Sequence, residues 1–142
     1  MADRALHHVW PTMLVLKNGA LLLAGGRSGL YVWVNARGDG HSWEQFNLAA
    51  HHNRTFADPG FAFSDEFVRG ACPPHTRTPA CSVSSSYTGV APLPDGESAV
   101  IVYDRYGVRP GEPDRIFTVR IRVSKTDDDA RTRMVLAIPG GW

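Results

Sequence analysis

The chain has 142 residues, of which 43% are hydrophobic and 20% are charged, and its formal net charge is +1. This composition is typical of one globular domain and excludes a largely disordered chain. The balanced charge disfavours nucleic acid as the main partner, because phosphate-binding domains usually carry a clear basic excess.

Short apolar runs separated by turn residues predict four β-strands in the first third of the chain. Asn18-Gly19 is a strong hairpin signal between two of them, and Gly38-Asp39-Gly40 predicts a later turn. Four short antiparallel strands joined by tight turns are typical of one blade of a β-propeller. The predicted strands cover residues 13–16, 20–24, 30–34 and 42–46.

A long segment from about residue 49 to 86 follows, without helical periodicity and with several prolines. It ends in the serine-rich run 82–86. A loop this long inside a compact domain is usually functional or disordered. Because loops over one face of a propeller form its ligand site, we expect this segment to be functional.

The strand pattern then restarts and predicts a second unit of four strands. Within residues 115–123 polar and apolar side chains alternate, which indicates a half-buried strand. Residues 127–129 are three aspartates that we interpret as a solvated turn rather than a metal site. The predicted strands of this unit cover residues 87–93, 98–103, 115–123 and 133–138.

Cys72 and Cys81 have two interpretations, as free thiols or as a loop disulfide that requires an oxidising compartment. With His75 they supply three metal ligands but no fourth, which disfavours a zinc site. Asn53 begins a glycosylation sequon. The sequon and the cysteines favour a secreted or extracellular location, although no signal peptide is visible. No apolar run reaches the roughly 18 residues that span a bilayer.

Four segments resemble the blades of sialidases, the neuraminidase-like enzymes with BNR or Asp-box repeats. Residues 14–27 join an Asn-Gly hairpin to an apolar strand that ends at an arginine. Residues 38–43 resemble a degenerate Asp-box. Residues 86–96 resemble the segment that carries the sialidase nucleophile, and residues 100–104 the strand that closes those enzymes.

The resemblance covers roughly residues 10 to 123 and implies an all-β chain that forms part of a six-bladed propeller. The whole chain, residues 1–142, would be a partial propeller domain supplying about its last two blades. The first blade would span about 11–48, the long loop about 49–86 and the second blade about 87–138. In the Asp-box, Gly38 stands where the family has its aspartate, with Asp39 one place late.

By this resemblance, Tyr87 is the candidate catalytic nucleophile, and the alternative is a strand tyrosine with a buried ring. Sialidases use a tyrosine because a carboxylate would be repelled by the carboxylate of the substrate. Arg27 is a candidate clamp for that carboxylate, and the alternative is an ordinary surface arginine. Arg105 is a weaker candidate that we expect to pair with Asp104. The family's glutamate has no counterpart in residues 8–12, and its acid/base aspartate is also missing.

His51, His52 and Asn53 follow the first unit and are candidate sugar-binding residues. Imidazole and amide groups can bind hydroxyls or transfer protons. Because adjacent residues of a strand face opposite ways, the two histidines do not predict a shared metal site. We expect no cofactor and no metal ion.

Three functions are therefore open. The first is a sialidase-like glycoside hydrolase domain, exo-α-sialidase-like if part of a complete propeller, acting on sialylated or other acidic glycans. The second is a non-catalytic propeller module that binds glycans or proteins. The third is a truncated product without a function of its own, whose exposed blade faces and strand edges predict aggregation or an oligomeric partner.

Overall fold

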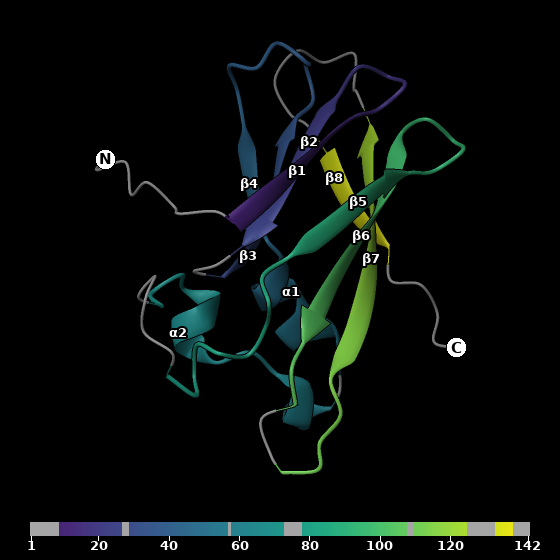
Figure 1. Cartoon of the computed structure of the whole chain (residues 1–142). Helices are drawn as coiled ribbons and strands as arrows, with labels where there is room; N and C mark the ends of the chain where they lie inside the picture. Colours follow the sequence, from purple (N-terminus) through teal and green to yellow (C-terminus); the bar gives the residue numbers. More distant parts are fainter. Residues whose placement is uncertain are drawn as a thin grey trace.

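The computed structural model describes residues 9–26, 29–56, 58–72, 78–107, 110–124 and 133–137. For residues 9 and 133–137 it describes the backbone alone. The described chain is mostly β-structure in two antiparallel sheets (Figure 1).

The first sheet confirms the four strands predicted for the first unit. They are hydrogen-bonded in chain order. The hairpin between the first two strands closes where the Leu16 N–H donates to the Ala20 carbonyl at 2.9 Å. Gly19 in this turn has φ of 83°, a conformation that glycine adopts readily. The strands are β1 (Val9–Val15), β2 (Leu21–Gly26), β3 (Leu30–Asn35) and β4 (Glu44–Asn47).

The second sheet confirms the strands predicted for the second unit, again hydrogen-bonded in chain order. Asp95 holds the hairpin turn between its first two strands, because its Oδ1 accepts from the backbone N–H groups of Glu97 and Ser98. The strands are β5 (Thr88–Pro92), β6 (Ser98–Arg105), β7 (Arg115–Ser124) and β8 (Arg133–Ala137). The aspartates 127–129 lie outside the described residues.

The segment between the sheets contains helices, so the expectation of a loop without helices is wrong. It holds α1 (Leu48–Thr55), the 3₁₀-helix η1 (Pro59–Phe61) and α2 (Asp65–Val68). Each helix starts at a polar cap: the side chains of Asn47, Asp58 and Ser64 each accept a backbone N–H of the first turn. Helices of three to eight residues are too short to show a clear period in the sequence.

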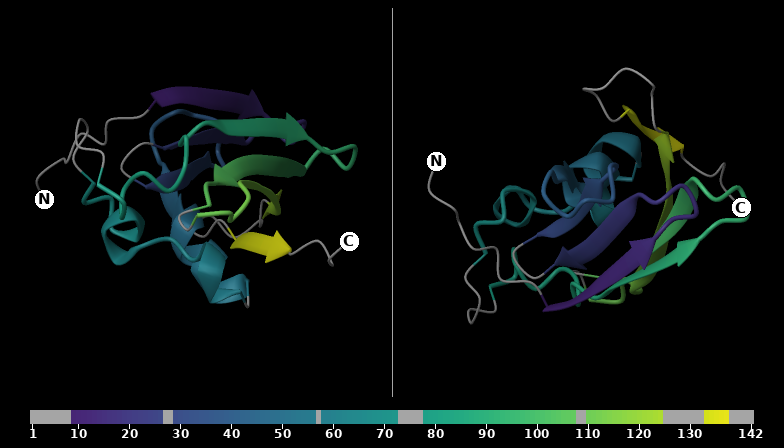
Figure 2. Two further views of the ribbon diagram at one scale, coloured as in Figure 1. Left: turned by 60° about the horizontal axis from the view of Figure 1, so that its bottom comes forward. Right: turned by 90° about the horizontal axis from the view of Figure 1, so that it is seen from above.

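The two hairpins lie side by side and point the same way. Near the start of β1, Thr12 Oγ1 donates to the Thr88 carbonyl at 3.0 Å. At the other end, the Asn18 side chain donates to the Val123 carbonyl at 2.8 Å, and its backbone N–H donates to the Gly96 carbonyl at 3.3 Å. Figure 2 shows β1 and β5 next to each other along one edge of the pair. The two turns therefore lie at one end, and the starts of β1 and β5 lie at the other.

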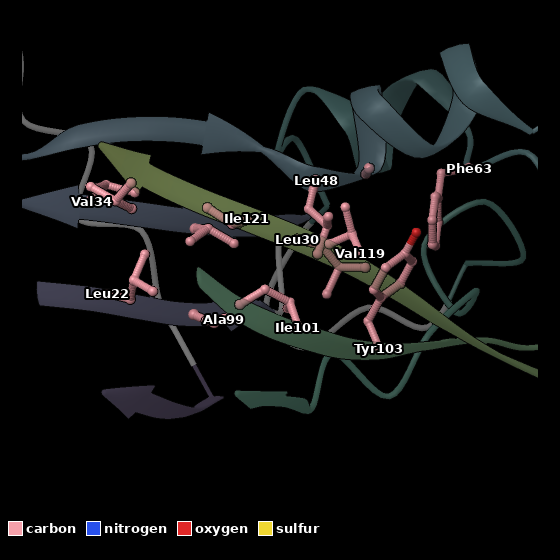
Figure 3. Packing of buried hydrophobic residues seen from close by; sticks show 14 of the residues in the cluster. Leu22, Leu30, Val34, Leu48, Phe63, Ala99, Ile101, Tyr103, Val119 and Ile121 are labelled. Atoms are coloured by element: carbon pink, nitrogen blue, oxygen red, sulfur yellow. The ribbon is translucent and has the colours of Figure 1, made fainter. Parts of the chain in front are cut away.

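One hydrophobic core fills the space between the sheets. Leu22 and Val34 of the first sheet point towards Ile101, Val119 and Ile121 of the second (Figure 3). All five are at most 3% exposed. Burying a side chain of this size contributes about 1.5–3 kcal/mol, so this layer ties the two sheets into one unit. Its arrangement as propeller blades stays a prediction.

A disulfide joins Cys72 to Cys81, which decides between the two interpretations of these cysteines. Cys72 belongs to the hydrophobic core and Cys81 packs against it. The bridge therefore fastens the region after α2 to the segment that leads into β5.

Gly26 provides a test of the close contact between the end of β2 and the segment that leads into β5. A Cβ on Gly26 would lie 2.7 Å from the Gly29 carbonyl oxygen and 2.9 Å from the Ser86 Cβ. We predict that Gly26→Ala lowers the free energy of unfolding by about 1–3 kcal/mol through overpacking. Urea denaturation measures the change.

Gly89→Ala is the matched control, because a Cβ there would lie 3.8 Å from the Val102 Cβ, an ordinary contact. We expect it to change the free energy by no more than about 0.5 kcal/mol. Equal effects of the two substitutions would contradict the contact.

Candidate functional site

The sequence-predicted site residues that the structure describes belong to elements that meet at one end of the sheet pair. Tyr87 directly precedes β5, Arg105 is the last residue of β6, and His51, His52 and Asn53 lie in α1. We call residues 48–87 the insert, and the end of the sheets where β1 and β5 begin the insert end. Antiparallel pairing brings strand starts and strand ends together there.

The chain positions next to Arg27 and Tyr87 touch each other. Gly26 ends β2 and packs against the side chain of Ser86, which is 4% exposed. Arg27 itself lies outside the described residues. The contact brings the last residue of β2 against the residue that precedes Tyr87, although 60 positions separate Gly26 from Ser86 in the sequence.

Residues 84–86 form a serine-rich turn that one carboxylate binds and that fixes the backbone position of Tyr87. Asp104, near the end of β6, accepts a hydrogen bond from Ser84 Oγ at 2.6 Å and from the Ser85 N–H at 3.0 Å. The Ser86 N–H then donates to Ser84 Oγ at 2.9 Å, and the Tyr87 N–H donates to Ser85 Oγ at 3.2 Å. Sequence reasoning missed Asp104 in this role, and the serine-rich run before Tyr87 was the available signal.

Ser86 has φ of 62°, in the left-handed region that side chains other than glycine seldom adopt. Such strained residues occur often at functional sites. The bend carries the chain from the insert into β5 and leaves Tyr87 at the surface. Tyr87 is 54% exposed, so the alternative of a buried strand tyrosine is wrong.

Among the described residues, the Tyr87 phenol has no hydrogen-bond or ion-pair partner. A tyrosine nucleophile with a pKa of about 10 requires a neighbouring base to take its proton. The catalytic role of Tyr87 therefore stays a prediction, and its base must come from elsewhere.

Arg105 is buried and faces the protein interior, with only 2% of its surface exposed. One terminal nitrogen donates to the Ala62 carbonyl at 2.9 Å, the other donates to the Tyr106 carbonyl, and the guanidinium carbon lies 5.6 Å from the centre of the Phe63 ring. Its Nε is buried without a partner in the described chain. Burial lowers the pKa of Arg105, and Glu112 acts in the opposite direction.

The expected pairing of Arg105 with Asp104 is wrong. Neighbouring residues of a strand point to opposite faces, so Asp104 reaches the serine turn while Arg105 reaches the Ala62 carbonyl of the insert. In this geometry Arg105 anchors the insert to β6, and its carboxylate-binding role stays a prediction.

His52 is 1% exposed and bonded through both ring nitrogens. Its Nε2 lies 3.1 Å from the Phe61 carbonyl, which can only accept, so Nε2 carries the proton. Its Nδ1 then accepts from the Tyr103 hydroxyl at 3.0 Å. Burial lowers the pKa of His52 to about 4. Aromatic rings surround the imidazole: Phe56, Phe63, Tyr103 and Phe117.

The other two candidates of α1 also face inward. His51 is 8% exposed and packs against Phe46, and burial lowers its pKa. The side chain of Asn53 donates to the Phe63 carbonyl and accepts from the Phe63 N–H, both at 2.8 Å. The sequon asparagine is therefore engaged within the fold, and all three residues hold the insert in place.

No helix in the described ranges is long and apolar enough to cross a membrane. The same residues contain no group of three or more histidine, cysteine, aspartate or glutamate side chains that could hold a metal ion. Comparison with protein families, curated proteins and solved structures finds no match to this chain. The geometry separates exposed Tyr87 from the buried or half-buried residues that hold the insert, His51, His52, Asn53 and Arg105.

The buried imidazole of His52 predicts a loss of stability in mild acid. Its pKa is about 4 in the folded protein and about 6.5 in an unfolded chain. Between these values the unfolded chain binds more protons, so the stabilisation is complete above pH 6.5 and is lost as the pH falls towards 4. The loss is about 3 kcal/mol, and His51 acts in the same direction.

Urea denaturation between pH 7 and pH 4 measures this dependence. We expect His52→Gln to be less stable at pH 7 and to have a flatter pH profile than the wild type. His41→Gln is the control, because His41 is exposed. An unchanged slope in His52→Gln would show that another group causes the acid sensitivity.

Proposed function

We propose that this chain is part of a sialidase-like glycoside hydrolase domain and binds the acidic sugar of a sialylated glycan at the insert end. The observation that carries the proposal is the contact between Gly26 and Ser86. It brings together the positions next to an arginine and an exposed tyrosine, the two residue types that the sialidase resemblance assigns to substrate carboxylate and anomeric carbon.

The chemistry of the pair suits an acidic sugar. A guanidinium matches the two oxygens of a carboxylate, and such charge-assisted hydrogen bonds are stronger than neutral ones. A tyrosine can offer its ring face to the apolar side of a sugar and its hydroxyl to a polar group. Asp104 supports this arrangement, because the serine turn that it binds fixes the backbone of Tyr87.

A second candidate function is glycan binding without hydrolysis. Two observations favour it: the Tyr87 phenol has no carboxylate partner in the described chain, and Arg105 is engaged with backbone carbonyls. Hydrolysis would require a base, an acid and further arginines besides Arg27 and Tyr87. The two candidates share the same binding site and differ only in turnover.

Titration calorimetry with 3′-sialyllactose tests the binding site. We predict that the chain binds this sugar in preference to lactose and that Arg27→Ala weakens binding at least about tenfold, the effect of losing one charge-assisted hydrogen bond. Arg122→Ala is the matched control. It removes the same charge from an exposed pair with Glu97 on the outer face of the second sheet, the face turned away from the core. Equal binding of lactose, or unchanged binding by Arg27→Ala, would contradict the site.

A fluorogenic sialoside separates the two candidates in the same preparation. Turnover that Tyr87→Phe abolishes would support the hydrolase. Binding without product release would support the non-catalytic module.

A further inference from the structure

The outer face of the first sheet is apolar and partly exposed, with Leu21, Leu23 and Trp33 half-buried, although its inner face is buried against the second sheet. Met13 is 64% exposed and Val15 is 59% exposed. The register places Met13 beside Leu23 and Leu23 beside Trp33, and it places Val15 beside Leu21. We call these five residues the outer face of the first sheet.

The two sheets can be matched residue by residue, because their first hairpins close in the same way. In the first sheet the Leu16 N–H donates to the Ala20 carbonyl, and the Gly19 N–H donates to the Leu16 carbonyl. In the second sheet the Leu93 N–H donates to the Ser98 carbonyl, and the Gly96 N–H donates to the Leu93 carbonyl. Leu16 therefore matches Leu93, and Ala20 matches Ser98, with one extra residue in the second turn.

The outer face of the first sheet corresponds to the inner, core-facing side of the second sheet when residues are matched outward from these pairs. The row Met13, Leu23 and Trp33 matches the row Val90, Ile101 and Val119 of the second sheet. In the second sheet this row is covered by the first sheet: Ile101 is 0% exposed, Val119 is 3% exposed and Val90 packs against the core. The outer face of the first sheet is thus the equivalent of a face that another sheet covers.

The covering face within the chain consists of small and medium aliphatic side chains. Leu22, Ala24, Val32 and Val34 of the first sheet supply it, all at most 1% exposed. We propose that the outer face of the first sheet is a docking surface for another four-stranded antiparallel sheet with such an aliphatic face, seated as the first sheet is seated on the second. This inference is independent of the proposed ligand.

A second copy of the chain does not offer this face. Its own Leu22, Ala24, Val32 and Val34 are already buried inside it. The outer face of its second sheet has Thr118 and Arg120 at the positions that match Val32 and Val34.

Arg120 pairs with Asp95 at 2.7 Å and the neighbouring Arg122 pairs with Glu97 at 2.9 Å. Burying these ion pairs against an apolar sheet would desolvate them. The outer face of the second sheet in another copy is therefore a poor partner for the outer face of the first sheet.

The test adds a further sheet to the full chain. A copy of residues 9–47, marked by Met13→Leu, is fused ahead of the chain through a flexible Gly/Ser linker of about 15 residues. Hydrogen peroxide oxidation followed by peptide mass spectrometry then reports the exposure of the original Met13. A control copy carries Val32→Thr and Val34→Arg as well, the residues that the second sheet has at the matching positions.

We predict that the added sheet slows oxidation of Met13 at least about tenfold, as burial of an exposed thioether requires, and that the control copy does not. No protection by the added sheet, or equal protection by both copies, would overturn the proposal. So would a chain that forms dimers by itself in sedimentation and protects Met13 before any sheet is added.

Leu23→Lys in the original sheet gives an independent thermodynamic readout. Leu23 is half-buried in the chain alone, where a lysine can extend its ammonium group into solvent, whereas beneath a docked sheet the substitution buries a charge. We expect a larger fall in melting temperature in the fusion than in the chain alone. Equal shifts in the two proteins would overturn the proposal, including the case in which the added sheet does not fold.

Discussion

The structure depends on the face-to-face burial of the two sheets. Strands β2 and β3 present Leu22 and Val34 to Ile101 and Ile121 of β6 and β7, with none of these side chains more than 1% exposed. Because strand residues alternate between faces, this packing decides the role of every other residue in the four strands. It leaves one apolar face, on the first sheet, and one face with charged pairs, on the second. It also aligns the hairpins, so that the insert reaches both sheets at one end.

The insert is held by polar groups that are themselves buried. His52 links the Phe61 carbonyl to the Tyr103 hydroxyl, and Arg105 donates to the carbonyl of Ala62. A buried polar group is tolerated only with hydrogen-bond partners, so these residues define where the backbone of the insert must lie. The same requirement predicts that the insert is sensitive to acid, since a protonated imidazole is poorly accommodated among aromatic rings.

Two kinds of residue thus meet at the insert end. Buried Arg105 and His52, together with half-buried Asn53, hold the insert against the sheets. Tyr87 is exposed at this end, and its backbone is fixed by the serine turn that Asp104 binds. A binding surface on such rigid support loses little conformational freedom when a ligand arrives.

The strands could be predicted from the sequence because their signals are local. Alternating side chains and turns such as Asn18-Gly19 depend only on neighbouring residues, and both sheets have the predicted strands. Helix α1 was missed because its eight residues leave too little room for a helical period.

The candidate site was predictable only in part, because burial is a long-range property. Arginine is usually exposed, and the burial of Arg105 depends on how the insert folds over β6. The same holds for His51 and His52, whose surroundings come from segments far away in the sequence. The predicted strand start at residue 87 lies next to the start of β5, whereas the exposure of Tyr87 and the role of Asp104 depend on how the serine turn folds.

Native-state hydrogen exchange of an Ile101→Val variant tests most directly whether the packed sheets form one unit. The substitution removes one methylene from the second sheet and is expected to lower stability by about 0.5–1.5 kcal/mol. We predict that the slowest-exchanging amides of β2 and β3 lose the same free energy of protection as those of β6 and β7, because neither sheet keeps its core without the other. A loss confined to β6 and β7 would show that the sheets are stable independently and would contradict the interdependence of the two faces.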